Sequence, residues 1–210
     1  MIRVIIADDH PIVRTGLKQI IADAPDMTVT DEANDGHETL RKIREKEFDV
    51  VILDITMPGM GGLDVLKQIR IEKPKMPVVV LSYHPEEQYA IRVLRAGASG
   101  YLTKGSSTDQ VLDAIRKVFR GGKYITPSLA ERLAGELEEG VEKPPHEGLS
   151  DREFQVLCLI ASGKRVRKIA EELSLSTKTI STYRSRILEK MKMKSNAELT
   201  HYAIKNRLVD

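Results

Sequence analysis

The sequence predicts a doubly wound α/β domain followed by a small all-helical domain. Over residues 1–120, short apolar runs alternate with segments of helical periodicity, and from residue 149 onward only helical periodicity follows. Charge divides the chain in the same way. Residues 1–126 contain 18 basic residues (Lys and Arg) and 18 acidic residues (Asp and Glu). Residues 127–148 contain 2 basic and 6 acidic residues, and residues 149–210 contain 13 basic and 7 acidic residues. We therefore expect a neutral domain, an acidic connector and a basic domain that meets a polyanion.

Five apolar runs predict strands, and five amphipathic segments predict the helices that connect them. The predicted strands are residues 2–7, 27–31, 50–53, 77–81 and 100–102. The predicted helices are residues 12–22, 38–45, 63–71, 86–96 and 108–119. Because repeated β/α units with right-handed crossovers give a parallel sheet wrapped by helices, we expect the strand order 2-1-3-4-5. The switch point of that order lies between the first and third strands.

Three acids follow the two strands beside this switch point. The third strand runs directly into Asp54, and the first runs into Asp8 and Asp9. Open α/β sheets bind their ligands at the carboxyl ends of the strands. Three carboxylates that converge there favour a hard divalent cation. Mg²⁺ fits best, because a site with few protein carboxylates leaves room for water and phosphate ligands.

Two further polar residues close strands at the same edge of the sheet. Ser82 follows the fourth strand, and Lys104 follows the fifth. A cation held by the acids can neutralise Asp54 and an incoming phosphoryl group, so that Asp54 attacks while Lys104 and Ser82 bind phosphoryl oxygens. Each residue alone has a structural interpretation: Asp8 or Asp9 as a helix N-cap, Ser82 as a turn residue, Lys104 as a solvated end. Their combination at one edge favours phosphoryl chemistry.

Residues 1–120 resemble the receiver domain of two-component signalling, a flavodoxin-like fold. The matching residues are Asp8, Asp9, Asp54, Met57, Pro58, Gly59, Ser82, Tyr101 and Lys104. The resemblance implies that Asp54 takes a phosphoryl group from the phosphohistidine of a sensor histidine kinase. It implies that Asp9, Asp54 and the Thr56 backbone carbonyl ligate Mg²⁺, with Asp8 helping through water. It also implies that Ser82 moves toward the phosphate and that Tyr101 swings inward on activation.

The resemblance implies a regulator and not an enzyme, because a receiver promotes only its own phosphotransfer and dephosphorylation. One residue departs from the family pattern. Receivers commonly carry a proline after the lysine, in a cis peptide bond, whereas this chain has Gly105. A cis bond before glycine costs more than one before proline, so Gly105 alters the local geometry of the pattern. Lys104 is still expected to reach the phosphate.

Residues 121–148 predict a linker that contains one short helix. Gly121 and Gly122 end the receiver-like part, and Ser128 is the predicted N-cap of a helix over residues 129–137. This helix carries an apolar stripe that is expected to pack on a neighbouring domain: Leu129, Leu133, Ala134 and Leu137. Residues 138–148 are rich in prolines, glycines and charges, which predicts an exposed, semi-extended linker with His146 solvated.

Residues 149–210 predict four helices that include a helix-turn-helix. Ser150 and Glu153 form a capping-box signature for a first helix that ends near residue 161. The second helix covers residues 167–173, with Ile169, Ala170 and Leu173 inward. After a turn at residues 174–176, the third helix covers residues 177–192 and the fourth covers residues 197–206. Two helices across a tight turn, the second long and basic, are typical of a helix-turn-helix.

The third helix has two unlike faces. Its expected core face holds Ile180, Ile187 and Met191, with Tyr183 or Leu188 beside them. The opposite face suits the major groove, because short hydroxyl side chains approach base edges while Lys and Arg contact phosphates. The predicted DNA-contacting residues are Lys178, Thr179, Ser181, Thr182, Tyr183, Arg184, Ser185, Arg186 and Lys190. A solvated amphipathic helix is the alternative, which the basic charge and the turn signature disfavour.

This second part resembles the LuxR-type helix-turn-helix of NarL/FixJ response regulators. The matching residues are Leu149, Ser150, Glu153, Leu157, Gly163, residues 168–173, Ser176, residues 178–180, Lys190 and Met191. Many members have Lys and His where Ser181 and Tyr183 stand, so we expect a different operator preference. Tyr183 can still reach a phosphate through its hydroxyl. The resemblance implies that the fourth helix is the dimer contact of the DNA-bound form.

The sequence predicts a cytoplasmic protein without a membrane segment. The longest apolar runs, such as residues 76–81, are far too short to span a bilayer, and the N-terminus lacks a signal-peptide layout. The single cysteine, Cys158, excludes an internal disulfide, which favours a reducing compartment. Because Cys158 lies in an apolar stretch, we expect it to be a small core residue.

Together these features predict a bacterial response regulator that binds promoter DNA as a dimer. Phosphorylation of Asp54 would shift a pre-existing equilibrium toward the state with paired receivers and a freed helix-turn-helix. Two alternatives stay open. One is an aspartyl-phosphate phosphatase of the haloacid-dehalogenase type, although Thr56 stands where that motif has a second acid. The other is a DNA-binding protein whose receiver serves only for dimerisation, which the complete acid, hydroxyl and lysine set disfavours.

Overall fold

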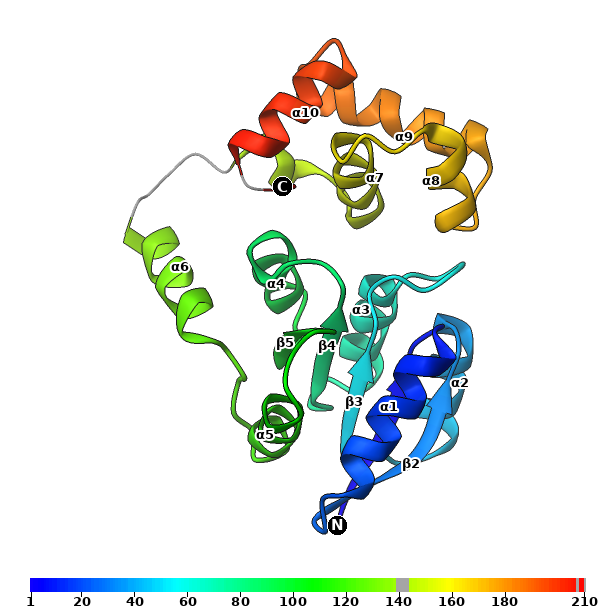
Figure 1. The fold of residues 1–210 in the computed structure, drawn as a ribbon, viewed down its shortest axis with the longest axis vertical. Coiled ribbons are helices and arrows are strands. Elements are labelled where there is room, and N and C mark those ends of the chain that lie inside the picture. Colours follow the sequence, from blue (N-terminus) through cyan, green and yellow to red (C-terminus); the bar gives the residue numbers. More distant parts are fainter. Residues whose placement is uncertain (139–143, 207, 210) are drawn as a thin grey trace. The chain divides into compact units, whose positions relative to one another are not determined.

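The computed structural model describes residues 1–138, 144–206, 208 and 209, with all their side chains except those of residues 87, 88 and 135–138. The chain forms two compact units, Met1–Glu131 and Arg132–Asp210. The first unit contains the sheet and the second contains helices only among its described residues, as Figure 1 shows. Each unit is considered by itself below.

A five-stranded parallel sheet forms the centre of the first unit. The strands are β1 (Ile2–Ala7), β2 (Met27–Ala33), β3 (Val50–Leu53), β4 (Val78–Ser82) and β5 (Gly100–Thr103). Their order is β2-β1-β3-β4-β5, which confirms the predicted topology. The carboxyl ends of neighbouring strands are in register, because Ala7 pairs with Leu53 and Ser82 pairs with Thr103. Side chains that follow these strands therefore meet at one edge.

Helices cover both faces of this sheet. They are α1 (Pro11–Ala22), α2 (Gly36–Glu45), α3 (Gly62–Glu72), α4 (Glu86–Arg95) and α5 (Thr108–Phe119). Leu17 of α1 and Ile115 of α5 share a core cluster with Val4 and Ile6 of β1. Because side chains alternate along a strand, the intervening residues of β1 face the opposite layer, where α2, α3 and α4 lie in Figure 1. Burial of both sheet faces explains the unbroken apolar run of β3 in the middle of the sheet.

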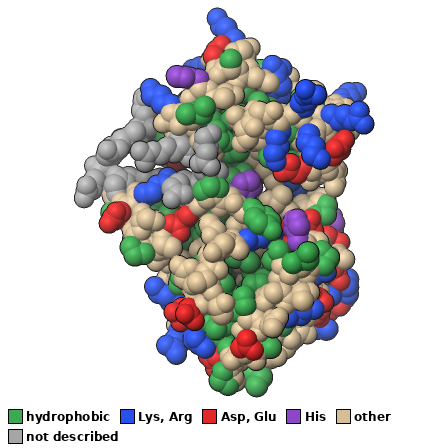
Figure 2. Space-filling view, in the orientation of Figure 1, with side chains coloured by type: hydrophobic (Ala, Val, Ile, Leu, Met, Phe, Trp, Pro, Cys, Tyr) green, Lys and Arg blue, Asp and Glu red, His purple; other side chains and the backbone are tan. Residues whose placement is uncertain are grey.

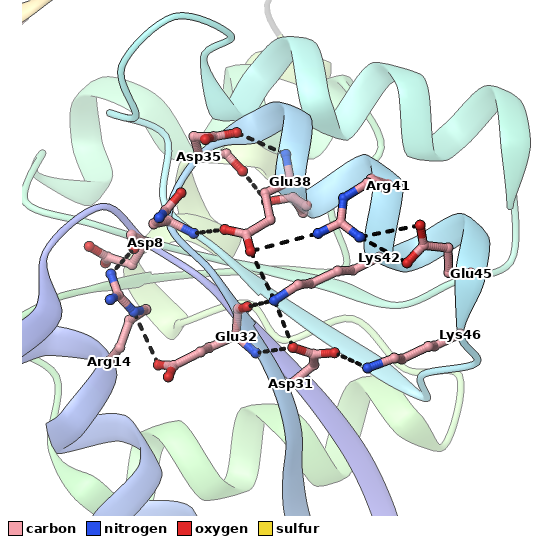
Figure 3. A network of polar contacts seen from close by, with 12 residues as sticks. Asp8, Arg14, Asp31, Glu32, Asp35, Glu38, Arg41, Lys42, Glu45 and Lys46 are labelled. Carbon is pink, nitrogen blue, oxygen red and sulfur yellow. Dashed lines mark hydrogen bonds and ion pairs between the residues drawn. The ribbon is translucent and has the colours of Figure 1, made fainter.

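The strand β2 and the helix α2 are joined by a network of charges (Figure 3). The Asp31 carboxylate accepts hydrogen bonds from Lys42 at 2.8 Å and Lys46 at 2.6 Å, and Lys42 also pairs with Glu38 at 3.0 Å. Burial opposes the ionised form of Asp31, but the two lysines outweigh it and lower its pKa to about 2. α2 begins two residues before its predicted start, because Asp35 accepts a hydrogen bond from the Glu38 backbone N–H.

The connector helix α6 (Pro127–Glu138) begins earlier than predicted. The Leu129 backbone N–H donates to the Thr126 hydroxyl at 3.2 Å, and the Ala130 N–H donates to the Thr126 carbonyl. The predicted N-cap at Ser128 is therefore wrong. Ser128 lies inside the helix, and its hydroxyl donates to Glu86 at 2.9 Å. Thr126 takes the capping position because Pro127 favours the first helical residue.

The predicted apolar stripe of the connector helix is only partly present. Leu129 is buried and Leu133 is half-buried, whereas Ala134 is exposed. The side chain of Leu137 lies outside the described part of the chain. Among the stripe residues whose side chains the structure describes, only Leu129 is buried.

Beyond the connector helix, the described residues of the second unit form a 3-10 turn and four helices. They are η1 (Pro145–Gly148), α7 (Asp151–Ala161), α8 (Val166–Glu172), α9 (Thr177–Lys190) and α10 (Asn196–Lys205). The predicted capping box is present, because Ser150 and Glu153 exchange hydrogen bonds. Phe154, Ile169, Ile180, Ile187 and Leu199 are buried in its core. None of the helices in the described ranges of the chain has the length and apolar character that crossing a bilayer requires.

The structure corrects the prediction for the end of the linker. His146 is half-buried, and its Nδ1 lies 2.7 Å from the Tyr202 hydroxyl of α10. Its ring also lies 5.9 Å from the Phe154 ring. The prediction of a solvated His146 is therefore wrong, because the aromatic residues of α7 and α10 provide a partner that linker composition does not reveal.

Candidate functional site

Two carboxylates meet where β1 and β3 end. Asp8 and Asp54 are each 2% exposed, and the Asp54 backbone N–H donates to the Ala7 carbonyl at 2.8 Å. Arg14 of α1 holds the Asp8 backbone by donating to its carbonyl at 2.7 Å (Figure 3). The adjacent carboxylate of Asp9 is 29% exposed. Asp8 and Asp54 are thus buried at the carboxyl edge of the sheet, whereas Asp9 is partly exposed there.

Lys104 lies between the two buried carboxylates. Its Nζ is 2.7 Å from Asp8 Oδ2 and 2.8 Å from Asp54 Oδ2, and its side chain is 3% exposed. The Lys104 backbone N–H donates to the Ser82 carbonyl, which ties the ends of β4 and β5 together. The Tyr83 ring covers the ammonium group, with 4.6 Å between Nζ and the ring centroid. The predicted lysine therefore reaches Asp54 directly.

Burial governs the electrostatics of this pair. It raises the pKa of Asp54 above its usual value, and Asp8 adds to this rise while Lys104 opposes it. Burial also disfavours the charged form of Lys104, but the attraction of Asp54 and Asp8 outweighs it and raises the pKa of Lys104. Lys104 therefore stays protonated, and its charge offsets part of the cost that burial and Asp8 impose on the ionised form of Asp54.

The remaining predicted receiver residues surround the same position. Thr56 donates its backbone N–H to Asp54 Oδ1 at 3.1 Å. Ser82 is buried, and its hydroxyl accepts a hydrogen bond from the His84 N–H at 3.2 Å. Tyr101 is buried as well, and its hydroxyl donates to the His84 carbonyl at 2.7 Å. The β4–α4 loop thus contacts both Ser82 and Tyr101.

Backbone geometry fixes two positions near the acids. A Cβ at Gly62 would lie 2.0 Å from the Asp54 carbonyl oxygen, so only glycine allows α3 to begin this close to the strand end. The described residues contain no cis peptide bond, so Lys104 and Gly105 are joined by a trans bond. The absence of the family's proline does not prevent Lys104 from contacting Asp54.

The acids and their neighbour His10 are suited to a divalent cation. Ligand atoms of Asp8, Asp9, His10 and Asp54 lie within 4.8 Å of one another. Asp9 Oδ1 is buried and receives no hydrogen bond in the described structure. Carboxylate oxygens gathered in this way suit a hard divalent cation such as Mg²⁺. His10 was not among the predicted ligands, although its position directly after two of them could have indicated it.

The exposed face of α9 carries most of the predicted DNA-contacting residues of the second unit. Lys178, Ser181, Thr182, Ser185 and Arg186 are exposed, whereas Thr179, Tyr183 and Arg184 are partly buried. The helix begins after Ser176, whose hydroxyl accepts from the Thr179 N–H at 3.0 Å. The hydroxyls of Ser181, Thr182 and Ser185 donate to carbonyls one turn earlier. They can accept hydrogen bonds from base edges but must rotate in order to donate.

Two of the predicted contacts are engaged inside the unit. Arg184 Nε donates to Asn196 Oδ1 of α10 at 2.6 Å. Lys190 Nζ donates at 2.6 Å to Glu153, whose carboxylate is 3% exposed. Burial raises the pKa of Glu153, but Lys190 and Ser150 outweigh it, so that this pKa lies below its usual value. Lys190 therefore stabilises the fold as it stands and would have to give up this partner to contact a phosphate.

A second group of basic residues lies on and beside α8. Arg165, Arg167 and Lys168 are exposed, and Figure 2 shows Lys and Arg side chains gathered over α8 and α9. Lys168 and Arg167 each pair with Glu171 of the same helix. The predicted DNA contacts lie on the third helix of this part and do not include these residues. The run of basic residues from Lys164 to Lys168 was the available signal.

Two family models match the chain. The model described as response regulator receiver domain matches residues 4–116, and the model described as bacterial regulatory proteins, luxR family, matches residues 147–203. The response regulator GacA of Pseudomonas viridiflava is 40% identical over 100% of this chain and 99% of its own length. The response regulator UvrY of Escherichia coli is 37% identical, over 99% of this chain and 96% of its own.

A solved structure also matches nearly the whole chain. RcsB from Salmonella enterica serovar Typhimurium, bound to promoter rprA in the presence of phosphomimetic BeF3⁻, is 26% identical with a TM-score of 0.66. The match covers 96% of this chain and 97% of that one. The family matches leave no support for the haloacid-dehalogenase alternative. The chain belongs to the two-component response regulators that join a receiver domain to a LuxR-type DNA-binding domain, and it is a DNA-binding transcriptional regulator.

Proposed function

We propose that Asp54 is the residue through which this regulator receives its signal. Asp54 Oδ2 attacks the phosphorus atom of a phosphohistidine on a sensor histidine kinase. The P–N bond breaks, and the electron pair returns to the imidazole, which takes up a proton. The observation that carries the proposal is the buried contact between Asp54 and Lys104 beside Asp8. It supplies a nucleophile and a fixed positive charge at one point.

The chain's own residues account for the remaining parts of this site. Asp9, Asp54 and the Thr56 carbonyl would hold Mg²⁺, with Asp8 acting through water. The cation supplies charge neutralisation between the carboxylate and the phosphoryl group. Lys104 transfers its contact from Asp54 to a phosphoryl oxygen. The buried Ser82 hydroxyl binds a second oxygen, and Tyr101 follows the β4–α4 loop through its bond to His84.

The second unit delivers the signal to double-stranded promoter DNA. The exposed face of α9 enters the major groove, with Lys178 and Arg186 on phosphates and Thr182 at base edges. Its exposed position and the neighbouring basic residues of α8 support this orientation. α10 is the dimer contact of the DNA-bound form. Its support is the side chain of Ile204, which is 53% exposed, together with a depression of about 500 Å³ on the same helix. Met193, Ala197, Glu198, His201, Tyr202 and Lys205 line this depression.

Phosphorylation and DNA binding are linked through dimerisation. The working parts are a receiver at residues 1–120, a linker at residues 121–148 and a DNA-binding domain at residues 149–210. Phosphorylated receivers pair, and the pair presents two α9 helices to two half-sites in the cytoplasm. Since a receiver acts only on itself, the chain turns over no external substrate.

Phosphorylation of Asp54 is tested by intact mass measurement after incubation with acetyl phosphate and Mg²⁺. The wild type gains one phosphoryl group, and Asp54→Ala gains none. Asp64→Ala is the matched control, because Asp64 is an exposed acid on α3. It gains one group as the wild type does. Retention of the phosphoryl group by Asp54→Ala would assign the acceptor elsewhere. Unchanged DNA affinity after full phosphorylation would favour a receiver that serves only for dimerisation.

A further inference from the structure

Arg184 lies on the flank of α9, between the exposed face of that helix and its core face. With about 3.6 residues per turn, it is about 60° around the helix from exposed Ser181 and about 40° from buried Ile180. A helix with its side chains is about 10–12 Å wide, and the major groove is about 12 Å wide. The flanks of a helix in the groove therefore face the phosphates on its two sides, so Arg184 is placed for a phosphate and not for a base edge.

The Arg184 guanidinium keeps its full charge inside the second unit. Other basic residues of this unit are paired with acids, as Lys190 is with Glu153. Among the residues whose side chains the structure describes, no carboxylate forms an ion pair with Arg184. Its hydrogen bond partner is instead an amide oxygen, Asn196 Oδ1, which lies 2.6 Å from Arg184 Nε. Because an amide is neutral, this bond fixes the guanidinium without cancelling its charge.

Asn196 lies at the end of a turn that hydrogen bonds and backbone conformation define on both sides. The turn closes α9 with Lys192 in the left-handed conformation, at a φ of 55°. Ser195 caps α10, because its hydroxyl accepts a hydrogen bond from the Glu198 backbone N–H at 3.2 Å. Asn196 is the first residue of α10. Its amide oxygen is therefore presented to α9 from a defined position.

The bond to Asn196 leaves one edge of the guanidinium available. Arg has five N–H donors in a planar fork, and Asn196 takes the single donor on Nε. The two terminal nitrogens of Arg184 can then donate side by side to two oxygens of one phosphate. An unrestrained arginine loses rotamer freedom when it binds. A guanidinium that Asn196 already orients loses less.

We propose that Asn196 is a positioning residue for DNA binding, which orients Arg184 so that its terminal nitrogens bind a phosphate beside the major groove. The inference rests on the proposed function, in which α9 enters the groove, and adds a residue that is not among the predicted DNA contacts. Asn196 acts only through Arg184. Because Asn196 belongs to α10, the same bond joins the proposed dimer helix to the helix that meets DNA.

The test measures DNA affinity of the full chain by fluorescence anisotropy at several salt concentrations, after treatment with acetyl phosphate and Mg²⁺. The probe is a labelled duplex enriched from a random-sequence pool by binding to the wild type. Asn196→Ala removes the acceptor and places a good helix former at the start of α10. We expect it to bind about three- to tenfold more weakly, since a long side chain must now be immobilised on binding. Its salt slope should stay unchanged, because Arg184 keeps its charge.

Arg184→Ala and the double variant show whether Asn196 acts through Arg184. Arg184→Ala should weaken binding and lower the salt slope by about 1, as expected for a phosphate contact. Adding Asn196→Ala to it should cause no further loss, whereas a role in fold stability alone would not depend on Arg184. Asn34→Ala is the matched control, because Asn34 is an exposed asparagine of the receiver, and it should bind as the wild type does.

The outcomes separate this inference from the function on which it rests. No loss in Asn196→Ala, or the same loss with and without Arg184, would overturn the role of Asn196. Wild-type affinity and salt slope in Arg184→Ala would overturn it too. Lys178→Ala tests the placement of α9 independently, and wild-type binding by both Lys178→Ala and Arg184→Ala would overturn that placement itself. Circular dichroism establishes that each variant is folded, and Asn196→Leu, of similar shape, serves as the second substitution if Asn196→Ala is not.

Discussion

Asp54 combines a chemical role with an unfavourable position in the folded protein. It is buried next to Asp8, and Lys104 must satisfy both carboxylates at once. Burial of like charges costs stability that a single ammonium group does not fully offset. A charged residue that is kept for its chemical role can therefore lower the stability of the fold. Its replacement by a neutral group of the same shape is expected to raise that stability.

We predict that Asp54→Asn raises the melting temperature of the receiver by a few degrees at neutral pH. The folded pKa of Asp54 is raised, chiefly by burial, so the stability associated with its protonated form is present below the unfolded pKa. That stability is lost as pH rises through the folded pKa. Lys104 keeps Asp8 as a partner in the variant.

Thermal melts of the wild type and Asp54→Asn from acid to neutral pH measure this difference. The melting temperatures should converge in acid and separate as the pH rises, with the variant higher. A variant that is less stable than the wild type at neutral pH would mean that the bond from Lys104 outweighs the cost of burial.

Lys178 of α9 is a proposed phosphate contact. Lys178→Ala should weaken binding to promoter DNA and lower the steepness of the salt dependence, log affinity against log salt, by about 1. Lys178 is exposed on the face opposite the core. Lys75→Ala is the matched control, because Lys75 is an exposed lysine of the receiver. Fluorescence anisotropy at several salt concentrations measures both. An unchanged salt slope in Lys178→Ala would place the DNA on another face.

The acidic site could be predicted from sequence because its residues follow strands. Asp8, Asp54 and Lys104 come directly after apolar runs, and parallel strands bring such positions to one edge. His10 and Tyr83 escaped prediction, because their contacts depend on side-chain direction and not on position in a strand. The pairing of Lys190 with buried Glu153 was also missed, since it joins α7 to α9 across the core.

At the scale of elements, the first turn of the connector helix is fixed to the receiver. Thr126 and Ser128 both donate hydrogen bonds to Glu86 at the start of α4, and Leu129 is buried. The β4–α4 loop before Glu86 also contacts Ser82 and Tyr101. The β4–α4 loop and Glu86 therefore connect Ser82 and Tyr101 at the acidic site with the first turn of α6.

We predict that Glu86→Ala loosens the first turn of α6. The Leu129 and Ala130 amides, which bond to Thr126, should exchange with solvent at least about threefold faster, because the variant loses both hydrogen bonds that Glu86 accepts from this turn. Hydrogen exchange followed by mass spectrometry measures this. Glu131→Ala is the control, since Glu131 is exposed on the same helix. Wild-type exchange in Glu86→Ala would show that Leu129 alone holds the turn.

The sequence predicted the elements of the receiver sheet and its helices better than the connector. Helix α5 and strands β1 and β3 have the predicted bounds, because apolar periodicity and caps determine them locally. The start of α6 and the turn η1 depend on Glu86 and Tyr202, which lie far away in the chain. Local composition cannot reveal such partners.

The whole molecule combines two units with different surfaces and separate cores. The first holds a neutral α/β domain with a buried acidic site, and the second holds the basic helices α8 and α9. Strand order could be predicted, since right-handed crossovers and five β/α repeats allow few topologies. Coupling of the two units through dimerisation remains a prediction, because the sequence describes each part and not their assembly.

The central claim is that phosphorylation of Asp54 controls assembly. Size-exclusion chromatography with light scattering tests it most directly, with and without Mg²⁺ and beryllofluoride, on the wild type, Asp54→Ala and the control Asp64→Ala. The wild type and Asp64→Ala should shift from monomer to dimer on addition of the phosphoryl mimic, and Asp54→Ala should stay a monomer. A wild type that does not shift, or an Asp54→Ala variant that dimerises equally, would contradict the account.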